Sequence, residues 1–539
     1  MKVRSDILRL YQNVHTWTGI IAGLFLFIGF FAGSITMFRM AIDDWATPPS
    51  VKLEQVEFSK IESALPKLLA QHQQAQKELT IRFDEAHSPF QWYSQGQGRG
   101  LRLDDKVVNA SVDQNGEIIT QDANVNELSA LVDMLHRTGG ILGDVAGHHI
   151  LGEFIMGFAT FLYFVALVSG VIFLLPTLTK SFFALRTKKG ASRFWLDTHN
   201  LVGIASLPFH IVIAFTVVVF AFHDFLYAGL SKVYGDKPMF PSDPPSKVEY
   251  SLAELPTLSD YINKAKAYAP GYSVSEIRLS GLSGARANAA ISLVNENQVM
   301  RGPNNDFIFM HPYTLKIQTS SVANGDQGVW GRAVSTFFAL HFGSYGGNFG
   351  RWLYFIMGLA GALLFYTGNL LWLEKRRQKQ GGQTKSVRFM ANLTVGVCLG
   401  SLLGVISCFA ATKWLSIGSI NINAAYMWVY YSCFIGALYL SFYKGATSAA
   451  MVLIKLSIVA CLWVPVTSII ALVIPTLGLW PATGLSQITL EVCAVITAFV
   501  YFKAYQCLEK RAYFGDKESI WSLDKSTQLS VEPTASIAK

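Results

Sequence analysis

The stretch Val14-His15-Thr16-Trp17-Thr18-Gly19 introduces the first long apolar run of the sequence, and Thr198-His199-Asn200-Leu201-Val202-Gly203 introduces the third. Each stretch has a histidine, three residues, a glycine and then a hydrophobic run. Leu135-His136 precedes the second run and Leu340-His341 precedes the fourth. Histidines that recur at matched places before paired runs indicate an internal duplication.

The spacing of the second and fourth runs agrees with this duplication. One extends over 152–170 and the other over 350–368, each beginning and ending with glycine and without a gap between the copies. The one mismatch is an insertion of seven residues after His136, which contains His148 and His149.

The composition predicts a membrane protein. Apolar residues make up 51% of the 539 residues and charged residues only 15%, whereas soluble proteins carry about 25% charged residues. A helix needs about 20 apolar residues to cross a bilayer. We expect an all-α bundle of about eight spans, at 18–38, 150–175, 200–225, 352–373, 390–412, 424–442, 450–474 and 485–505.

Basic residues predict the orientation of these spans. They gather before the first run, between the second and third runs, and between the fourth and fifth runs. The positive-inside rule then places both termini in the cytoplasm. We expect the membrane to be the cytoplasmic membrane of a bacterium. The net charge of +8 is therefore a topology signal, and we expect the lipid bilayer, and no nucleic acid, as a partner.

This topology leaves two large segments in the periplasm, 40–148 and 227–350. Each shows a helical stretch followed by short strands, which predicts two small α+β modules. The six cysteines all lie in or beside the last four runs, so a disulfide framework in the outer segments is excluded. The predicted order is span one (1–39), module one (40–148), spans two and three around a basic loop (149–226), module two (227–350), span four (351–377), four further spans (390–505) and a cytoplasmic tail (506–539).

Each copy of the repeat has two spans, so the copies run parallel across the membrane. We therefore expect His15 and His199 at one depth near the cytoplasmic face, and His136 and His341 together near the outer face. Facing imidazoles at two levels in a dry bundle suit the axial ligation of two b-type haems. His148 or His149 could replace His136, and the mid-membrane His210 could be a ligand, a proton relay or a packed core histidine.

These motifs, together with Trp195-x-Asp197-x-His199 and Tyr366-Thr367-Gly368-Asn369, resemble the PepSY-associated transmembrane family of bacteria over residues 1–377. The resemblance implies PepSY-like outer modules and kinship with iron-regulated inner-membrane proteins, some of which are ferric-siderophore reductases with two haems. The last four spans lie beyond the likeness, contain no histidine and receive no role.

We expect a haem b electron-transfer protein that reduces a ferric siderophore or another ferric chelate on the periplasmic side, with no catalytic side chain and no metal beyond haem iron. The electron donor is unidentified and is a quinol or a cytoplasmic reductase. One alternative is a transition-metal transporter. Another is a membrane-anchored PepSY protein that binds or regulates a partner without redox activity.

Overall fold

The computed structural model describes residues 4–85, 87–96, 101, 103–143, 151–178, 184–186, 190–235, 250–322, 328–376, 383–418, 420–515 and 519–523. The chain divides into two compact units. We call them the membrane unit (Met1–Ala46, Leu131–Ala214 and Met357–Lys539) and the sheet unit (Thr47–Ala130 and Phe215–Ile356).

Eight helices among the described residues are long and apolar enough to cross a bilayer, which confirms the predicted number of spans. They are α1 (Ser5–Thr36), α6 (Leu151–Leu174), α9 (Leu207–Tyr234), α12 (Gly347–Lys375), α13 (Lys385–Leu415), α14 (Ile422–Lys444), α15 (Ala446–Val473) and α16 (Leu485–Phe514). At the C-terminal ends the largest differences from the predicted spans are in α9, which continues to Tyr234, and in α16, which continues to Phe514.

The third predicted span is two helices rather than one. Helix α8 (Ala191–Ala205) ends at Ser206, whose φ of −99° and ψ of 7° leave the helical region, and α9 starts at the next residue. Pro208 explains the break, because it has no N–H to donate to the carbonyl four residues earlier. As a result, His199 lies on α8 and His210 lies on α9.

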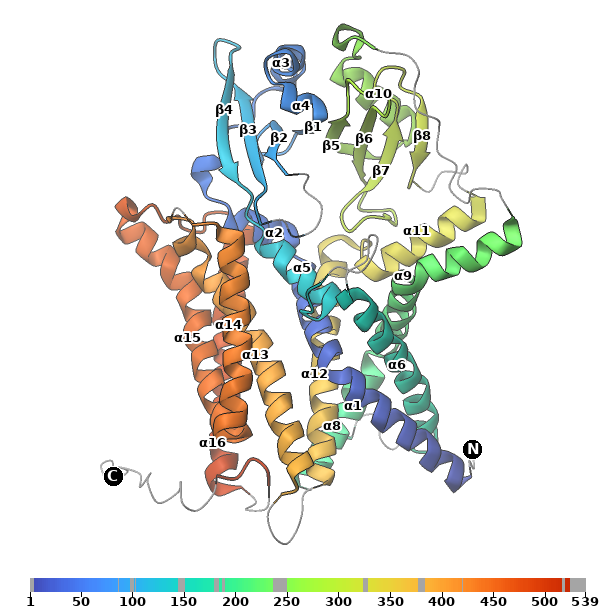
Figure 1. Cartoon of the computed structure of the whole chain (residues 1–539), viewed down its shortest axis with the longest axis vertical. Coiled ribbons are helices and arrows are strands. Elements are labelled where there is room, and N and C mark those ends of the chain that lie inside the picture. The colour runs from blue at the N-terminus through green and yellow to red at the C-terminus, as the bar shows by residue number, and fades with distance from the viewer. Residues whose placement is uncertain are drawn as a thin grey trace. The chain divides into compact units, whose positions relative to one another are not determined.

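Helices α13 to α16 lie side by side as a bundle of long helices (Figure 1). Gly396, Gly400 and Gly404 repeat at every fourth residue of α13 and face α14. A Cβ at Gly404 would lie 2.8 Å from the ring of Tyr430, and one at Gly400 would lie 2.9 Å from the Cβ of Ala437. Small residues at this spacing let two membrane helices approach closely.

In each of its two chain segments the sheet unit has helical stretches followed by short strands, the order that the sequence predicts. Its elements are α3 (Phe58–Gln71), α4 (Gln73–Lys77), β1 (Glu78–Arg82), β2 (Phe90–Gln95), β3 (Lys106–Val112), β4 (Ile118–Asn124), α10 (Leu258–Tyr268), β5 (Ser273–Ser280), β6 (Asn288–Val294), β7 (Asp306–Met310) and β8 (Ile317–Ser320). Two connecting helices follow these strand groups, α5 (Leu128–Thr138) and α11 (Gly328–Phe342).

The strands of the two predicted modules form one sheet, which the sequence did not predict. The order is β4-β3-β2-β1-β5-β6-β7-β8, and β1 pairs antiparallel with β5 in the middle. Ile81 and Ile277 are direct partners there and both are fully buried. Arg82 Nε donates to Glu276 Oε2 across the same pair at 3.0 Å. The pairing removes two exposed strand edges, which would otherwise be open to association.

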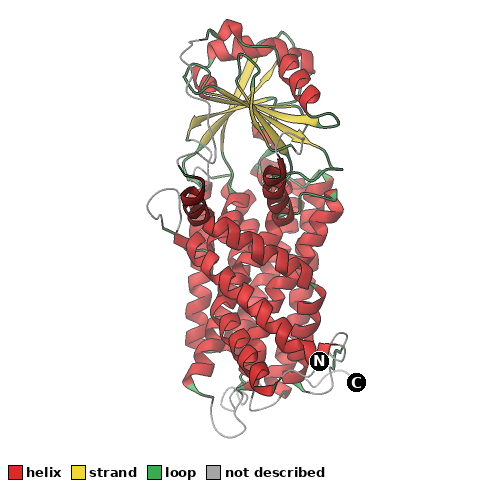
Figure 2. Cartoon of the chain, turned by 90° about the vertical axis from the view of Figure 1, so that its right-hand side faces the viewer, coloured by secondary structure: helices red, strands yellow, loops and turns green. Residues whose placement is uncertain are grey.

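The core of the sheet unit lies between the sheet and its helices. Figure 2 shows the strands as a twisted fan with helices on one face. Leu68 of α3 and Tyr261 of α10 are fully buried in the same cluster as Leu79 of β1 and Ile291 of β6. The helices of both chain segments therefore cover one shared hydrophobic core.

A disulfide between β1 and β5 tests the single sheet. Thr80 and Arg278 are Cα partners, and opposite Cβ atoms in an antiparallel pair lie about 4.5–5.5 Å apart, which suits a disulfide. We expect the Thr80→Cys/Arg278→Cys variant to oxidise readily, as measured by peptide mass spectrometry. Thr120→Cys/Thr319→Cys, on the two outer strands of the sheet, is the control and should stay reduced; equal oxidation of the two pairs would contradict the pairing.

Candidate functional site

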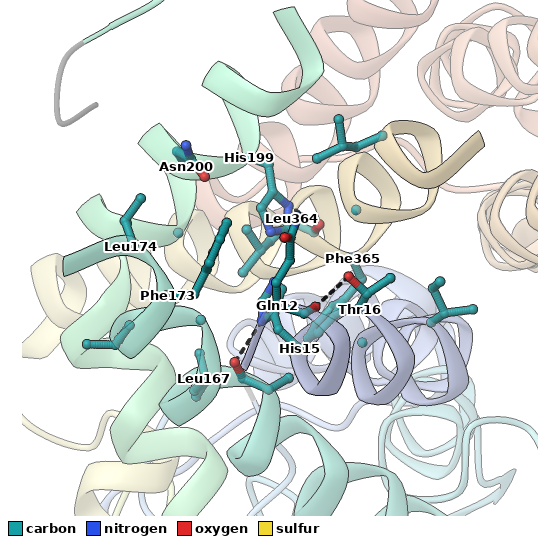
Figure 3. Close-up of a pocket in the computed structure, with 18 of the residues that line it drawn as sticks. Gln12, His15, Thr16, Leu167, Phe173, Leu174, His199, Asn200, Leu364 and Phe365 are labelled. Carbon is teal, nitrogen blue, oxygen red and sulfur yellow. Dashed lines mark hydrogen bonds between the residues drawn. The ribbon is translucent and has the colours of Figure 1, made fainter. Parts of the chain in front are cut away.

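The structure brings His15 of α1 and His199 of α8 together. Their ring centroids are 6.0 Å apart and the ring planes are inclined at 70°. Figure 3 shows both side chains in the wall of one cavity, together with residues of α6 and α12. The two histidines are 184 positions apart in the sequence, so the contact depends on the fold.

Each of these imidazoles is fixed by a backbone carbonyl. Nδ1 of His15 lies 2.8 Å from the carbonyl oxygen of Ala166, and Nδ1 of His199 lies 3.2 Å from that of Leu364. A carbonyl only accepts, so Nδ1 carries the proton and Nε2 of the neutral ring keeps its lone pair. This arrangement is typical of histidines that ligate a metal, because the second bond sets both the tautomer and the ring orientation.

Glycines make room for both rings. Gly170 and Gly368 each lie four residues after the carbonyl that holds the histidine. A Cβ at Gly170 would lie 2.9 Å from Nδ1 of His15, and one at Gly368 would lie 3.4 Å from Cε1 of His199. The first contact is too close for a side chain, so Gly170 is required where it stands.

The cavity beside these histidines has a volume of about 620 Å³, which is in the range of small-molecule and cofactor sites. Most of its wall is apolar and comes from α1, α6, α8, α9 and α12. Lys375 and Arg376 add two positive charges, and none of the described residues that line it is Asp or Glu. The cavity therefore suits a largely apolar ligand that carries negative charge at one edge.

The separation of the rings also fits a shared metal. A metal held by two imidazole nitrogens at about 2 Å each puts the nitrogens about 4 Å apart and the ring centroids roughly 6 Å apart. The observed separation is 6.0 Å. Hence the two imidazoles have a spacing at which both could bind one metal ion, and His15 and His199 are the residues that would hold a haem here.

His136 shows the same manner of attachment on α5. Its Nδ1 lies 2.7 Å from the carbonyl oxygen of Gly29 on α1. A Cβ at Gly33, one turn further along α1, would lie 2.6 Å from the same nitrogen. A carbonyl and a glycine again hold an imidazole against a spanning helix.

His341, on α11, belongs to the sheet unit, whereas His136 belongs to the membrane unit. Nδ1 of His341 lies 3.0 Å from the hydroxyl of Thr216 on α9. Its ring packs against Phe220 with centroids 5.0 Å apart. His136 and His341 thus each have a partner that fixes the ring, and their use as one ligand pair stays a prediction.

His210 is completely buried, and neither of its ring nitrogens has a hydrogen-bond partner among the described residues. It is surrounded by aromatic rings, including Phe30 at 5.7 Å and Tyr163 at 5.9 Å between centroids. The three predicted roles of His210, as a ligand, a proton relay or a packed core histidine, all stay predictions. The other alternates, His148 and His149, lie outside the described residues.

Several residues that shape the site were not assigned to it from the sequence. Asp197, two residues before His199, is buried and accepts two hydrogen bonds of 2.8 Å from the guanidinium of Arg186. This ion pair anchors the start of α8. Asp197 is part of the Trp195-x-Asp197-x-His199 motif, so its closeness to His199 could have indicated a role in the site. Lys375 and Arg376 belong to the basic group between the fourth and fifth apolar runs, which the sequence analysis uses only to predict orientation, and both also line the cavity.

Larger metal clusters do not occur in the described part of the chain. No three His, Cys, Asp or Glu side chains come close enough there to hold a metal ion. A metal that enters this site would need a pair of histidines and further ligands of its own, as a haem iron has in its macrocycle.

Eight apolar helices and paired, carbonyl-held histidines define a multi-pass membrane protein with a cofactor-sized cavity. The family model described as the PepSY-associated TM region matches residues 12–375, so the chain belongs to this family. The match covers α1 to α12 and ends before α13. A comparison with curated proteins gives no match.

Replacement of His210 by leucine tests its role. Leucine is also the residue at the equivalent position of the first copy, Leu26. A buried polar group without a partner costs about 1–3 kcal/mol, so we expect His210→Leu to raise the thermal unfolding temperature of the detergent-solubilised protein. Phe209→Leu, at the neighbouring position, is the control and should lower it. A destabilised His210→Leu variant would mean that the imidazole has a polar partner in solution.

Proposed function

We propose that the protein is a haem b electron-transfer protein of the bacterial cytoplasmic membrane, which reduces a ferric siderophore or another ferric chelate on the periplasmic side. The observation that carries this proposal is the pair His15 and His199, with ring centroids 6.0 Å apart beside a cavity of about 620 Å³. Membership of the PepSY-associated family supports a membrane protein of this kind.

Bound haem would supply one-electron chemistry that no side chain of the chain can provide. The chain contributes the ligands and their orientation. His15 and His199 present Nε2 to the cavity because their Nδ1 atoms are bonded to Ala166 and Leu364. These bonds also make each imidazole a stronger donor to a metal.

The apolar wall and the positive edge of the cavity serve the same ligand. Leu26, Leu364 and Phe365 contribute apolar side chains to the wall. Lys375 and Arg376 offer partners for carboxylate groups, and such charge-assisted contacts are stronger than neutral hydrogen bonds. An apolar plate with a carboxylate-bearing edge is the shape and charge pattern of haem.

We further propose that the four histidines derive from an internal duplication and that His136 and His341 ligate a second, outer haem. The carbonyls that hold His15 and His199 stand at equivalent places, four residues before Gly170 and Gly368. The two halves of the sheet unit, each a helix followed by four strands, would be PepSY-like domains. Both termini would be cytoplasmic, with a quinol or a cytoplasmic reductase as donor.

The decisive experiment is a dithionite-reduced minus oxidised spectrum of the purified protein, with haem quantified as the pyridine haemochrome. We expect a b-type α-band and about two haems per chain, one for each histidine pair. Well-folded protein that was expressed with ample haem and shows no Soret band would exclude this function. Metal transport or partner binding by the sheet unit would then be the functions to test.

Single substitutions test the inner ligands. We expect His15→Ala and His199→Ala each to lose one of the two haems. In each variant a single imidazole would remain to hold the inner haem, and alanine leaves a gap where the other imidazole stood. His72→Ala, in the sheet unit, is the control and should keep both haems. Retention of two haems by His15→Ala would rule out this ligand assignment.

Gly170→Ala tests the packing of the His15 ring against α6 and leaves both histidines of the inner site unchanged. The added Cβ would lie 2.9 Å from Nδ1 of His15, so the ring must move and its bond to Ala166 must lengthen. We expect a loss of inner haem affinity in the range of about 10–100-fold that is usual for the partners of metal ligands. Gly436→Ala on α14, where a Cβ meets nothing within 4 Å and which does not line the cavity, should keep the wild-type affinity, as measured by the rate of haem transfer to a scavenging globin.

A further inference from the structure

The four C-terminal helices lie beyond the family match, yet they contain a buried cluster of charged and aromatic side chains. Lys413 of α13 is 1% exposed and Glu491 of α16 is 8% exposed. Nζ of Lys413 lies 3.2 Å from Oε1 of Glu491, and Ser468 of α15 donates to the same oxygen at 2.5 Å. Charged groups in spanning helices are costly and usually have a function.

This cluster holds the short helix α2 (Arg39–Ala46), which directly follows α1. Trp45 of α2 is 1% exposed, and its Nε1 donates to Oε1 of Glu491 at 3.0 Å. The ammonium group of Lys413 lies 4.9 Å from the centroid of the Trp45 ring. Trp480, between α15 and α16, donates to the carbonyl of Trp45 at 3.0 Å. Helix α13, helix α16 and the segment with Trp480 therefore all contact α2 and hold the C-terminal end of α1 in place.

A second contact holds the end of the helix that carries His136. The hydroxyl of Tyr431 on α14 donates to the carbonyl of Gly140 at 2.8 Å. Gly139 and Gly140 have φ values of +61° and +80° and form the turn that ends α5. Glycine favours these left-handed conformations. The turn is thereby tied to α14 only four residues after His136.

Both attachments flank the place where His136 meets α1. The histidine bonds to the carbonyl of Gly29 and packs over Gly33, and α2 begins six residues after Gly33. Movement of α2 or of the turn at Gly140 would change the distance between α5 and α1. The contacts at Trp45 and Gly140 therefore both affect the distance between α5 and α1.

We infer that α13 to α16 form a brace that positions His136 against α1 and so sets the geometry of the outer haem site. Tyr431, Trp45 and Glu491 are positioning residues in this arrangement. The inference rests on the proposed function, because it assigns His136 to a haem, but it concerns a segment to which neither the family match nor the histidine pattern gives a role.

The test compares Tyr431→Phe, Trp45→Phe and their double variant with Tyr439→Phe. Tyr439 is on the same helix as Tyr431 and is 68% exposed. In place of tyrosine, phenylalanine removes the hydroxyl and keeps the ring, whereas in place of Trp45 it removes the Nε1 donor and leaves a smaller aromatic ring. The readouts are the electron paramagnetic resonance signals of the two ferric haems, their midpoint potentials and the rate of haem loss. The signal that disappears in His136→Ala is assigned to the outer haem. The signal of the haem at His15 and His199 serves as the internal control.

We expect Tyr431→Phe and Trp45→Phe to shift the outer signal and to speed loss of the outer haem roughly tenfold, with the inner signal unchanged. Tyr439→Phe should leave both unchanged. Overturning results are wild-type outer signals in the folded double variant, or equal shifts of the inner and outer signals, which would indicate general loosening.

A measurement without cofactor separates this inference from the proposed function. In a His136→Cys background, the rate of maleimide labelling at position 136 reports how tightly this position is held against α1. Peptide mass spectrometry distinguishes it from the natural cysteines, which all lie in α13 to α16. We expect labelling to be several-fold faster with Tyr431→Phe than with Tyr439→Phe. Equal rates would refute the brace even if the wild-type protein carried no haem.

Discussion

In the membrane unit, polar groups have to find their partners within the chain, because hydrocarbon offers none. The carbonyl oxygens of Ala166, Leu364 and Gly29 meet this requirement in an unusual way, since each accepts a hydrogen bond from an imidazole. A helical carbonyl already accepts from the backbone four residues later, so the histidine uses its second lone pair. The side chain is thereby fixed to a neighbouring helix and not to a mobile loop.

This one type of contact determines much of the surrounding sequence. A ring that approaches a helix backbone so closely leaves no space for a side chain at Gly170 or Gly33, where an added Cβ would lie 2.9 Å and 2.6 Å from a histidine nitrogen. At Gly368 the corresponding contact would be 3.4 Å, so the fit around His199 is looser. The histidine and the glycine of each copy therefore belong to the same contact, because the imidazole ring packs against the backbone of the glycine. The ion pair of Asp197 and Arg186 then holds the start of α8 in place. Helix α8 has only 15 residues and is too short to cross the membrane by itself.

The sequence was most informative where one physical requirement dominates. Apolar length predicted the eight spans, and paired histidines predicted the contact between α1 and α8 that the structure contains. It was less informative where structure depends on the sum of distant contacts. The use of Lys375 and Arg376 in the cavity wall depends on how α12 packs against the other helices. The break before α9 is different, because Pro208 causes it locally. The partners of Lys413 and Trp45 lie 78 and 446 positions away, so no local pattern could reveal them.

The joining of β1 to β5 has a consequence for how the protein is made. Arg82 and Glu276 meet across this pair, and 194 positions separate them along the chain. The first half of the sheet is complete long before the ribosome reaches the second, and two spanning helices are synthesised in between. During this interval β1 has an unpaired edge, which is the feature that invites wrong partners. Newly made chains should therefore pass through a stage that is vulnerable to association between molecules, and it ends only when β5 arrives.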